Sequence, residues 1–89
     1  MLMNQRNADI QKDLLIALAD LAANDSRDRI RIALAGGIIK ILYAMADHER
    51  NANVQEHGCG ALANLALNND NNKVTIADAG GITTILSAM

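Results

Sequence analysis

Hydrophobic and polar residues follow one another along this chain in a pattern that occurs twice. In each occurrence apolar residues fall at i, i+4, i+7, i+8 and i+11, a spacing that places them on one face of a helix. The pattern predicts two long amphipathic helices, over about 10–22 and 54–67. The residues predicted to face the core are Ile10, Leu14, Ala17, Leu18 and Leu21, and then Val54, Gly58, Ala61, Leu62 and Leu65.

Each long helix is followed by a polar run, NDSRD in the first case and NNDNN in the second. Asn, Asp and Ser are the residues that best cap the N-terminus of a helix, so each run indicates that another helix begins there. Short helices are predicted over about 28–34 and 72–78. We interpret the runs themselves as caps and connectors, and Arg27, Arg29 and Arg31 as a solvated helix face.

Glycine pairs mark the next change of direction. Gly36 and Gly37 follow the first short helix, and Gly80 and Gly81 follow the second. Glycine adopts positive φ without strain, so each pair allows a sharp corner. A further helix is predicted after each corner, over about 38–46 and 82–89, and another corner is predicted at DHERNAN. No segment has the pattern of a β-strand.

The sequence repeats itself at an offset of 44 residues. Residues 17–42 overlay residues 61–86 without a gap, and nearly half of all positions compared at this offset are identical. A period of 40–47 residues with helical patterning is typical of a two- or three-helix unit stacked into a solenoid. We therefore expect one domain, 1–89, made of two units at about 1–45 and 46–89.

The recurring motifs resemble those of the armadillo repeat family. VQE opens a long helix, ALANLA closes it, and AGGITTIL contains the glycine corner, all at the spacings of that family. The resemblance covers nearly the whole chain and implies an all-α, armadillo-type solenoid, a right-handed superhelix of three-helix repeats. The helices would come in the order third, first, second, twice, with residues 1–3 as the tail of a second helix. HEAT repeats are a related alternative.

The resemblance also implies a function, because the third helices of armadillo proteins line a concave groove that binds extended peptides. A family Asn at the position of Asn64 holds the peptide main chain, since a carboxamide both donates and accepts hydrogen bonds. Asp20 stands at the equivalent position of the first unit and cannot donate. The Trp that many peptide-binding relatives have one turn earlier is absent. The candidate peptide-binding residues are Asn64, Gly60, Glu56, Asp20, Ile16 and Lys12.

A second function is compatible with the same residues. No polar capping repeat is evident, and the chain resembles an excerpt of a longer array, whose terminal units expose apolar faces. The alternative is therefore a structural module that forms homo-oligomers, by stacking or by exchange of helix 10–22, with no ligand of its own. Of the two glycines in the second long helix, Gly58 is expected to allow close helix packing and Gly60 to be a tolerated surface residue.

Composition narrows the remaining possibilities. The net charge of -2 gives no general attraction to nucleic acid or to an anionic membrane, so neither is an expected partner. Cys59 is the sole cysteine, which is consistent with an intracellular, cytoplasmic or nuclear protein without an intramolecular disulfide. No nucleophile–base pair, metal-ligand spacing or phosphate-binding loop occurs. We expect neither enzymatic activity nor a metal or other cofactor.

Overall fold

The computed structural model describes the backbone of residues 2–89 and the side chains of residues 6–89. Within residues 2–89 it contains six α-helices and no β-strand, so the predicted all-α fold is confirmed. Each half of the chain has one long helix followed by two shorter ones. The helices are α1 (Leu2–Asn24), α2 (Ser26–Leu34), α3 (Gly37–Asp47), α4 (Ala52–Ala66), α5 (Asp70–Asp78) and α6 (Gly81–Ala88).

Side-chain caps begin the short helices, as the polar runs predicted. A carboxylate oxygen of Asp25 accepts a hydrogen bond from the backbone N–H of Arg27 at 2.8 Å. The side-chain oxygen of Asn69 accepts one from the N–H of Asn72 at 2.9 Å, and Asn51 caps α4 in the same way. These bonds satisfy N–H groups that have no partner inside their own helix. They explain why the chain starts a new helix at each of these points.

The two glycines of each corner serve different purposes. Gly36 has a φ of +81° and Gly80 a φ of +86°, in the left-handed region that glycine enters without a steric penalty. Gly37 is required for a different reason, because a Cβ atom there would lie 2.7 Å from the carbonyl oxygen of Ile32. The same close approach recurs at Gly81. Each pair thus turns the chain and lets the next helix start directly against the short helix before it.

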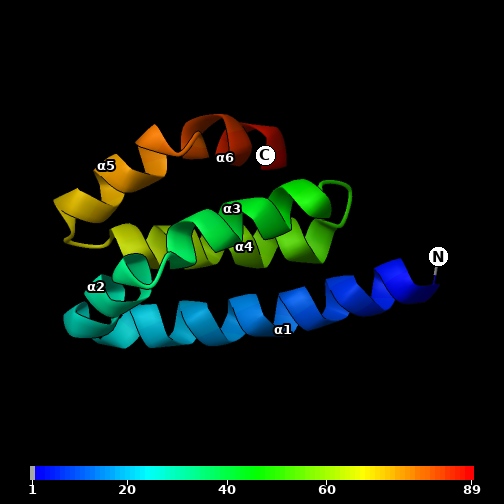
Figure 1. The fold of residues 1–89 in the computed structure, drawn as a ribbon, viewed down its shortest axis with the longest axis horizontal. Coiled ribbons are helices and arrows are strands. Elements are labelled where there is room, and N and C mark those ends of the chain that lie inside the picture. Colours follow the sequence, from blue (N-terminus) through cyan, green and yellow to red (C-terminus); the bar gives the residue numbers. More distant parts are fainter. Residues whose placement is uncertain (1) are drawn as a thin grey trace.

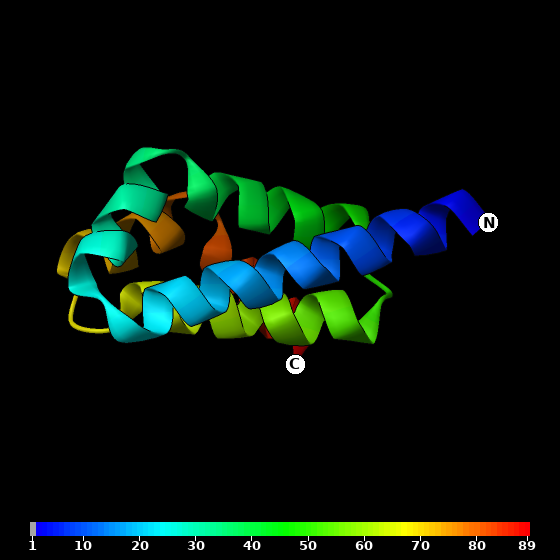
Figure 2. The same ribbon diagram turned by 90° about the horizontal axis from the view of Figure 1, so that it is seen from below.

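The helices form an elongated body of 38 × 23 × 20 Å. Helices α1 and α4 run side by side in the same direction, and α3 runs back in the opposite direction against α4 (Figure 1). Helices α5 and α6 lie on the other side of α3 and α4 from α1 (Figure 1). The first turns of α1 project beyond the other helices (Figure 2). The second half of the chain therefore continues the stacking that the first half begins.

The core lies where α1, α3 and α4 meet. It is built from Ile, Leu, Val, Met and Ala, as the composition required. In α4 the predicted core face is confirmed in full, because all five of its residues are buried. The buried hydrophobic side chains of this core are Ala8, Leu15, Ala22, Ile38, Ile41, Leu42, Met45, Val54, Ala61, Leu62, Leu65 and Ile76.

The core prediction for α1 was largely wrong. Ile10, Leu14 and Leu21 are each about half exposed, and Leu18 is only partly buried against the core. Ala17 is also exposed. The buried residues of α1 are Ala8, Leu15 and Ala22, which lie on a different face of the helix. The physical reason is that α1 packs on α4 with that face, whereas no helix of residues 2–89 covers the face that carries the predicted stripe.

The start of the chain also differs from the prediction. Residues 1–3 were expected to form the tail of a separate helix, followed by a corner. Instead α1 is one continuous helix from Leu2 to Asn24, and Met1 lies outside the described residues. The corner predicted at DHERNAN is present between α3 and α4, where the turn at 48–50 separates the two helices.

Candidate functional site

The six residues singled out from the sequence lie on α1 and α4, the two parallel neighbouring helices. Asp20, Glu56 and Gly60 are exposed, whereas the remaining three are half-buried. The half-buried residues are Lys12, Ile16 and Asn64. Because α1 and α4 are side by side, the two sets of three lie on adjacent helices of one surface.

Asn64 makes a specific contact across this surface. Its Nδ2 donates a hydrogen bond to the carbonyl oxygen of Ala19 on α1, at 2.9 Å. Ala19 directly precedes Asp20, so the bond brings the Asn64 amide to the part of α1 that carries Asp20. A carboxamide has two N–H groups and a carbonyl oxygen that accepts two hydrogen bonds. One bond to Ala19 therefore uses only part of what Asn64 can offer.

The surface carries charge of mainly one sign. Asp20 and Glu56 are exposed carboxylates, and Asp13 is exposed one residue after Lys12. The Nζ of Lys12 lies 3.6 Å from a carboxylate oxygen of Asp13, so this lysine is already paired. Exposed ion pairs of this kind contribute little to stability but do neutralise the cation locally. The remaining carboxylates make this surface suited to a cationic ligand rather than to an anionic one.

The two glycines of α4 have different surroundings, as predicted. A Cβ atom at Gly58 would lie 2.6 Å from both Cγ and Sδ of Met45, so Gly58 allows α3 and α4 to approach closely. A Cβ atom at Gly60 would have no heavy atom within 4 Å apart from its own helix backbone and chain neighbours. Gly60 therefore leaves an open gap between Glu56 and Asn64 on the surface of α4.

Arg29 has a structural role that the sequence did not reveal. Its Nε donates to the carbonyl oxygen of Ala22 at 2.6 Å, and Nη2 donates to that of Ala23 at 3.1 Å. Nη1 donates to the carbonyl oxygen of Leu67 at 3.2 Å. One guanidinium thus satisfies carbonyl groups at the C-terminal ends of both α1 and α4. The interpretation of Arg29 as part of a solvated face was wrong, although Arg27 and Arg31 are exposed.

Asn72 is the polar residue most deeply buried among the described side chains. Its Nδ2 donates to the carbonyl oxygen of Leu65 at 2.8 Å and to that of Arg29 at 3.2 Å. These bonds connect α5 with α4 and α2, so Asn72 stabilises the packing between the two units. No pattern in the sequence indicated this role, because the residue at the equivalent position of the first unit is Asp28.

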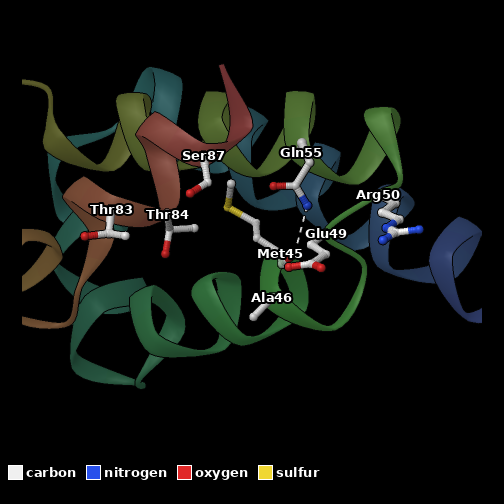
Figure 3. Close-up of a pocket in the computed structure, with 8 residues that line it drawn as sticks. All are labelled: Met45, Ala46, Glu49, Arg50, Gln55, Thr83, Thr84 and Ser87. Carbon is white, nitrogen blue, oxygen red and sulfur yellow. Dashed lines mark hydrogen bonds between the residues drawn. The ribbon is translucent and has the colours of Figure 1, made fainter.

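A hollow of about 310 Å³ lies between the C-terminal end of α3, the α3–α4 turn and α6 (Figure 3). Gln55 borders it, and its Nε2 donates to the carbonyl oxygens of Met45 at 2.8 Å and His48 at 3.0 Å. The side chain of Gln55 therefore caps the C-terminus of α3. Figure 3 shows Thr83, Thr84 and Ser87 projecting from α6 on the opposite side of the hollow.

Two further grooves lie at opposite ends of the stack. The α1/α3 groove has a volume of about 300 Å³, and its lining is mainly apolar. It is formed by residues that include Leu14, Ala17, Leu18, Ile41 and Ala44. The α4/α6 groove has a volume of about 470 Å³, and its apolar lining is Ala52, Cys59, Ala88 and Met89.

Cys59, in the α4/α6 groove, is a free thiol that is half-buried. Partial burial raises the pKa of this thiol above 9.0, because desolvation disfavours the thiolate. A raised pKa lowers the share of thiolate, so Cys59 is expected to react more slowly than a fully exposed cysteine.

No group of three or more His, Cys, Asp or Glu residues in the described part of the chain is placed to hold a metal ion. Nor does any helix of residues 2–89 combine the length and the apolar character that crossing a bilayer requires. Comparisons with models of known protein families, with curated proteins and with solved structures find no match.

Proposed function

We propose that this chain is an armadillo-type module that binds an extended polypeptide across the exposed faces of α1 and α4. The class of fold is supported by the 44-residue repeat and by the order of helices, a long helix followed by two short ones, twice. In that reading α1 and α4 are the third helices of successive units, and the stack is a short right-handed superhelix. Parallel long helices that lie side by side are the geometry such a solenoid requires.

One observation carries the binding proposal: the hydrogen bond from Asn64 to the carbonyl oxygen of Ala19 brings this amide to the turn of α1 that carries Asp20. Together the Asn64 amide and the Asp20 carboxylate offer three acceptor oxygens and one further N–H donor toward a ligand. A polypeptide main chain presents alternating N–H and C=O groups, which this combination can pair. The open gap at Gly60 leaves room for main chain to approach α4.

The charges on the surface favour a basic peptide. A lysine or arginine side chain of the ligand would lie near Asp20 and Glu56, which are both exposed. Contacts between exposed charges contribute about 0.2–1 kcal/mol each, so affinity would depend on several such contacts and would weaken with salt. A peptide of about ten residues spans roughly 35 Å when extended, enough to cross two helices whose axes are about 8–10 Å apart.

Fluorescence polarisation with two labelled ten-residue peptides tests this proposal. One peptide alternates Lys with Ser and the other alternates Glu with Ser, so that they differ only in charge. The Lys peptide is expected to bind and the Glu peptide is not. Asp20→Asn is expected to weaken binding of the Lys peptide by about two- to fivefold, the effect of one exposed ion pair.

Asp47→Asn is the matched control, because Asp47 is an exposed carboxylate at the end of α3, away from the α1/α4 surface. Equal binding of both peptides, or an equal effect of the two substitutions, would contradict the proposed site. Asn64→Ala is expected to weaken binding as well. Its melting temperature must be measured alongside, since the substitution also removes the bond to Ala19.

A further inference from the structure

The exposure of α6 differs sharply from that of α3, its equivalent in the first unit. Ile82 is 60% exposed, whereas its equivalent Ile38 is 1% exposed. Leu86 is 64% exposed, whereas its equivalent Leu42 is 7% exposed. The residue pairs are identical in type, so the difference arises entirely from their surroundings. Helix α3 has α4–α6 packed beyond it, and within residues 2–89 no helix lies beyond α6 in this way.

Helix α1 shows the reciprocal difference. Ile10 and Leu21 are about half exposed, whereas their equivalents in α4, Val54 and Leu65, are completely buried. Helix α4 has α1–α3 packed before it, and the described chain provides no such layer before α1. The face left open on α1 is therefore the counterpart of the α4 face that packs against the first unit.

We propose that the chain associates head to tail with a second copy of itself. Helix α1 of one copy lies in the α4/α6 groove of the other, as α4 lies against α1 and α3 within the chain. The contact of α4 with α1 and α3 inside the chain, here called the internal joint, identifies the occupant. It brings together the same kinds of faces that remain open at the two ends of the stack. The joint relies on apolar side chains, chiefly Leu14, Leu21 and the apolar lining of the groove, although Glu56 also borders that groove. Peptide binding and self-association are therefore tested by different variants.

The α4/α6 groove has the composition that such a joint needs. Its apolar lining is Ala52, Cys59, Ala88 and Met89. Every equivalent of these residues in the first unit is buried, and those equivalents are Ala8, Leu15, Ala44 and Met45. The rest of the lining is polar and consists of Glu49, Arg50, Gln55, Glu56 and Ser87. The small side chains of Ala52, Cys59 and Ala88 leave room for a helix to approach, as α4 approaches α1 and α3 inside the chain.

A polar contact of the internal joint can also form between copies. Inside the chain Gln55 donates to the carbonyl oxygen of Met45. Gln11 and Met89 occupy the equivalent positions at the joint between copies, so Gln11 of the second copy can donate to the Met89 carbonyl. The joint thus retains the cap at the C-terminal end of a helix, here α6.

Two differences make the joint between copies weaker than the internal one. Leu14 of the second copy would stand where Gly58 stands, a position at which even a Cβ atom crowds Met45. Met89, the equivalent of Met45, must therefore move aside, which its position beyond the end of α6 permits. Asp20 replaces Asn64 and cannot donate to a carbonyl oxygen, so that bond between neighbouring helices is lost. The association is consequently reversible and depends on concentration.

The joint is heterologous, because one copy contributes its α1 face and the other its α4/α6 groove. Each copy retains one open face after the first contact, and such contacts form open chains of copies unless the rotation closes a ring. The wild-type protein is therefore expected to show a mass that rises steadily with concentration, without a plateau at the dimer.

Two blocked variants test this geometry. Leu14→Asp/Leu21→Asp places charges on the α1 face, and Ile82→Asp/Leu86→Asp places charges beside the α4/α6 groove. All four residues are more than 45% exposed, so the charges do not enter the core. Circular dichroism and thermal melting of each variant establish that it is folded. Molar mass is then measured by sedimentation equilibrium and light scattering.

Each blocked variant alone is expected to be a monomer, and an equimolar mixture is expected to form a heterodimer and nothing larger. This result is specific to head-to-tail packing, because each variant keeps the one face that the other has lost. A wild-type protein that stays monomeric up to high micromolar concentration would overturn the proposal. So would a blocked variant that still self-associates, or a mixture of folded variants that forms no dimer.

Cys59 gives an independent readout of which face is covered. For this measurement the variant blocked at Ile82 and Leu86 also carries Cys59→Ala, so that only the intact groove contains a thiol. The rate of alkylation by iodoacetamide is expected to fall at least severalfold when the two variants are mixed. An unchanged rate in a mixture that has dimerised would show that the copies meet elsewhere.

Discussion

The sharpest prediction compares two glycines that are two residues apart on α4. Replacing Gly58 or Gly60 with Ala makes the same chemical change in the same helix. Each substitution gains about 1 kcal/mol from the higher helix propensity of Ala. Any difference between the two variants therefore reports what surrounds each Cβ atom.

At Gly58 the new methyl group would lie 2.6 Å from Cγ and Sδ of Met45. Met45 is 1% exposed, and its side chain can move only toward the hollow that it lines, at the cost of its present contacts. Adding a methyl group to a filled core costs about 1–3 kcal/mol, which cancels or exceeds the gain in propensity. Gly58→Ala is therefore expected to change stability by between roughly zero and a loss of 2 kcal/mol.

At Gly60 the methyl group meets no atom within 4 Å, so Gly60→Ala is expected to stabilise by the full gain of about 1 kcal/mol. The two variants should thus differ by about 1–3 kcal/mol. For a domain of this size that corresponds to roughly 5–20 °C in melting temperature. Thermal and urea unfolding followed by circular dichroism, at one fixed protein concentration, measure the difference directly.

Equal shifts in the two variants would refute the reasoning, because they would mean that Met45 does not press on α4 at Gly58. A double-mutant cycle sharpens the comparison. Met45→Ala creates a cavity in the wild-type background, but in the Gly58→Ala background it also relieves the crowding. Met45→Ala should therefore cost less stability in the Gly58→Ala background than in the wild-type background. No such coupling energy should appear between Met45→Ala and Gly60→Ala.

Three further predictions concern the helix ends. Arg29→Met removes charge-assisted bonds to three carbonyl groups and is expected to lower the free energy of unfolding by about 1.5–3 kcal/mol in urea titrations; the control Arg31→Met, at an exposed side chain, should change it by less than about 0.5 kcal/mol. Asn72→Ala removes the hydrogen bonds to the carbonyl oxygens of Leu65 and Arg29 and is expected to cost about 1–3 kcal/mol. Unchanged stability in the same urea titration would contradict this claim. The hydrogen bond from Arg27 holds the pKa of the Asp25 carboxyl below 3.8. The ionised carboxylate therefore stabilises the folded state above pH 3.8, and this contribution is lost as the pH falls further. Between about pH 5 and about pH 2 the wild-type protein should lose more stability than Asp25→Asn, and parallel pH profiles would contradict this.

The residues of the candidate site could largely be located from the sequence, but the contacts that they make could not. The 44-residue repeat placed Asn64 and Asp20 at equivalent positions of two helices. The hydrogen bond from Asn64 to Ala19 joins residues 45 positions apart, and no local pattern indicates it. Arg29 is a similar case, because its bond to Leu67 spans 38 positions. Such contacts depend on the distance between two helix axes, which the residues of one helix do not specify.

Apart from the start of α1, the sequence by itself determined the helices, the caps of α2 and α5 and the corners. The polar runs predicted the starts of α2 and α5, and the glycine pairs predicted the turns before α3 and α6. The reason is that capping and positive φ are properties of a few consecutive residues. The amphipathic spacing in α4 also identified its core face correctly.

Only the tertiary structure decided which face of α1 is buried. The spacing that identified the core face of α4 selected Ile10, Leu14 and Leu21 in α1, which are half exposed. Hydrophobic periodicity shows that a face can be buried, but a second element must be present to bury it. In a stack of repeats that element belongs to the neighbouring unit. Equal sequence patterns therefore give different exposures in α1, which lies at an end of the stack, and in α4, which lies in its interior.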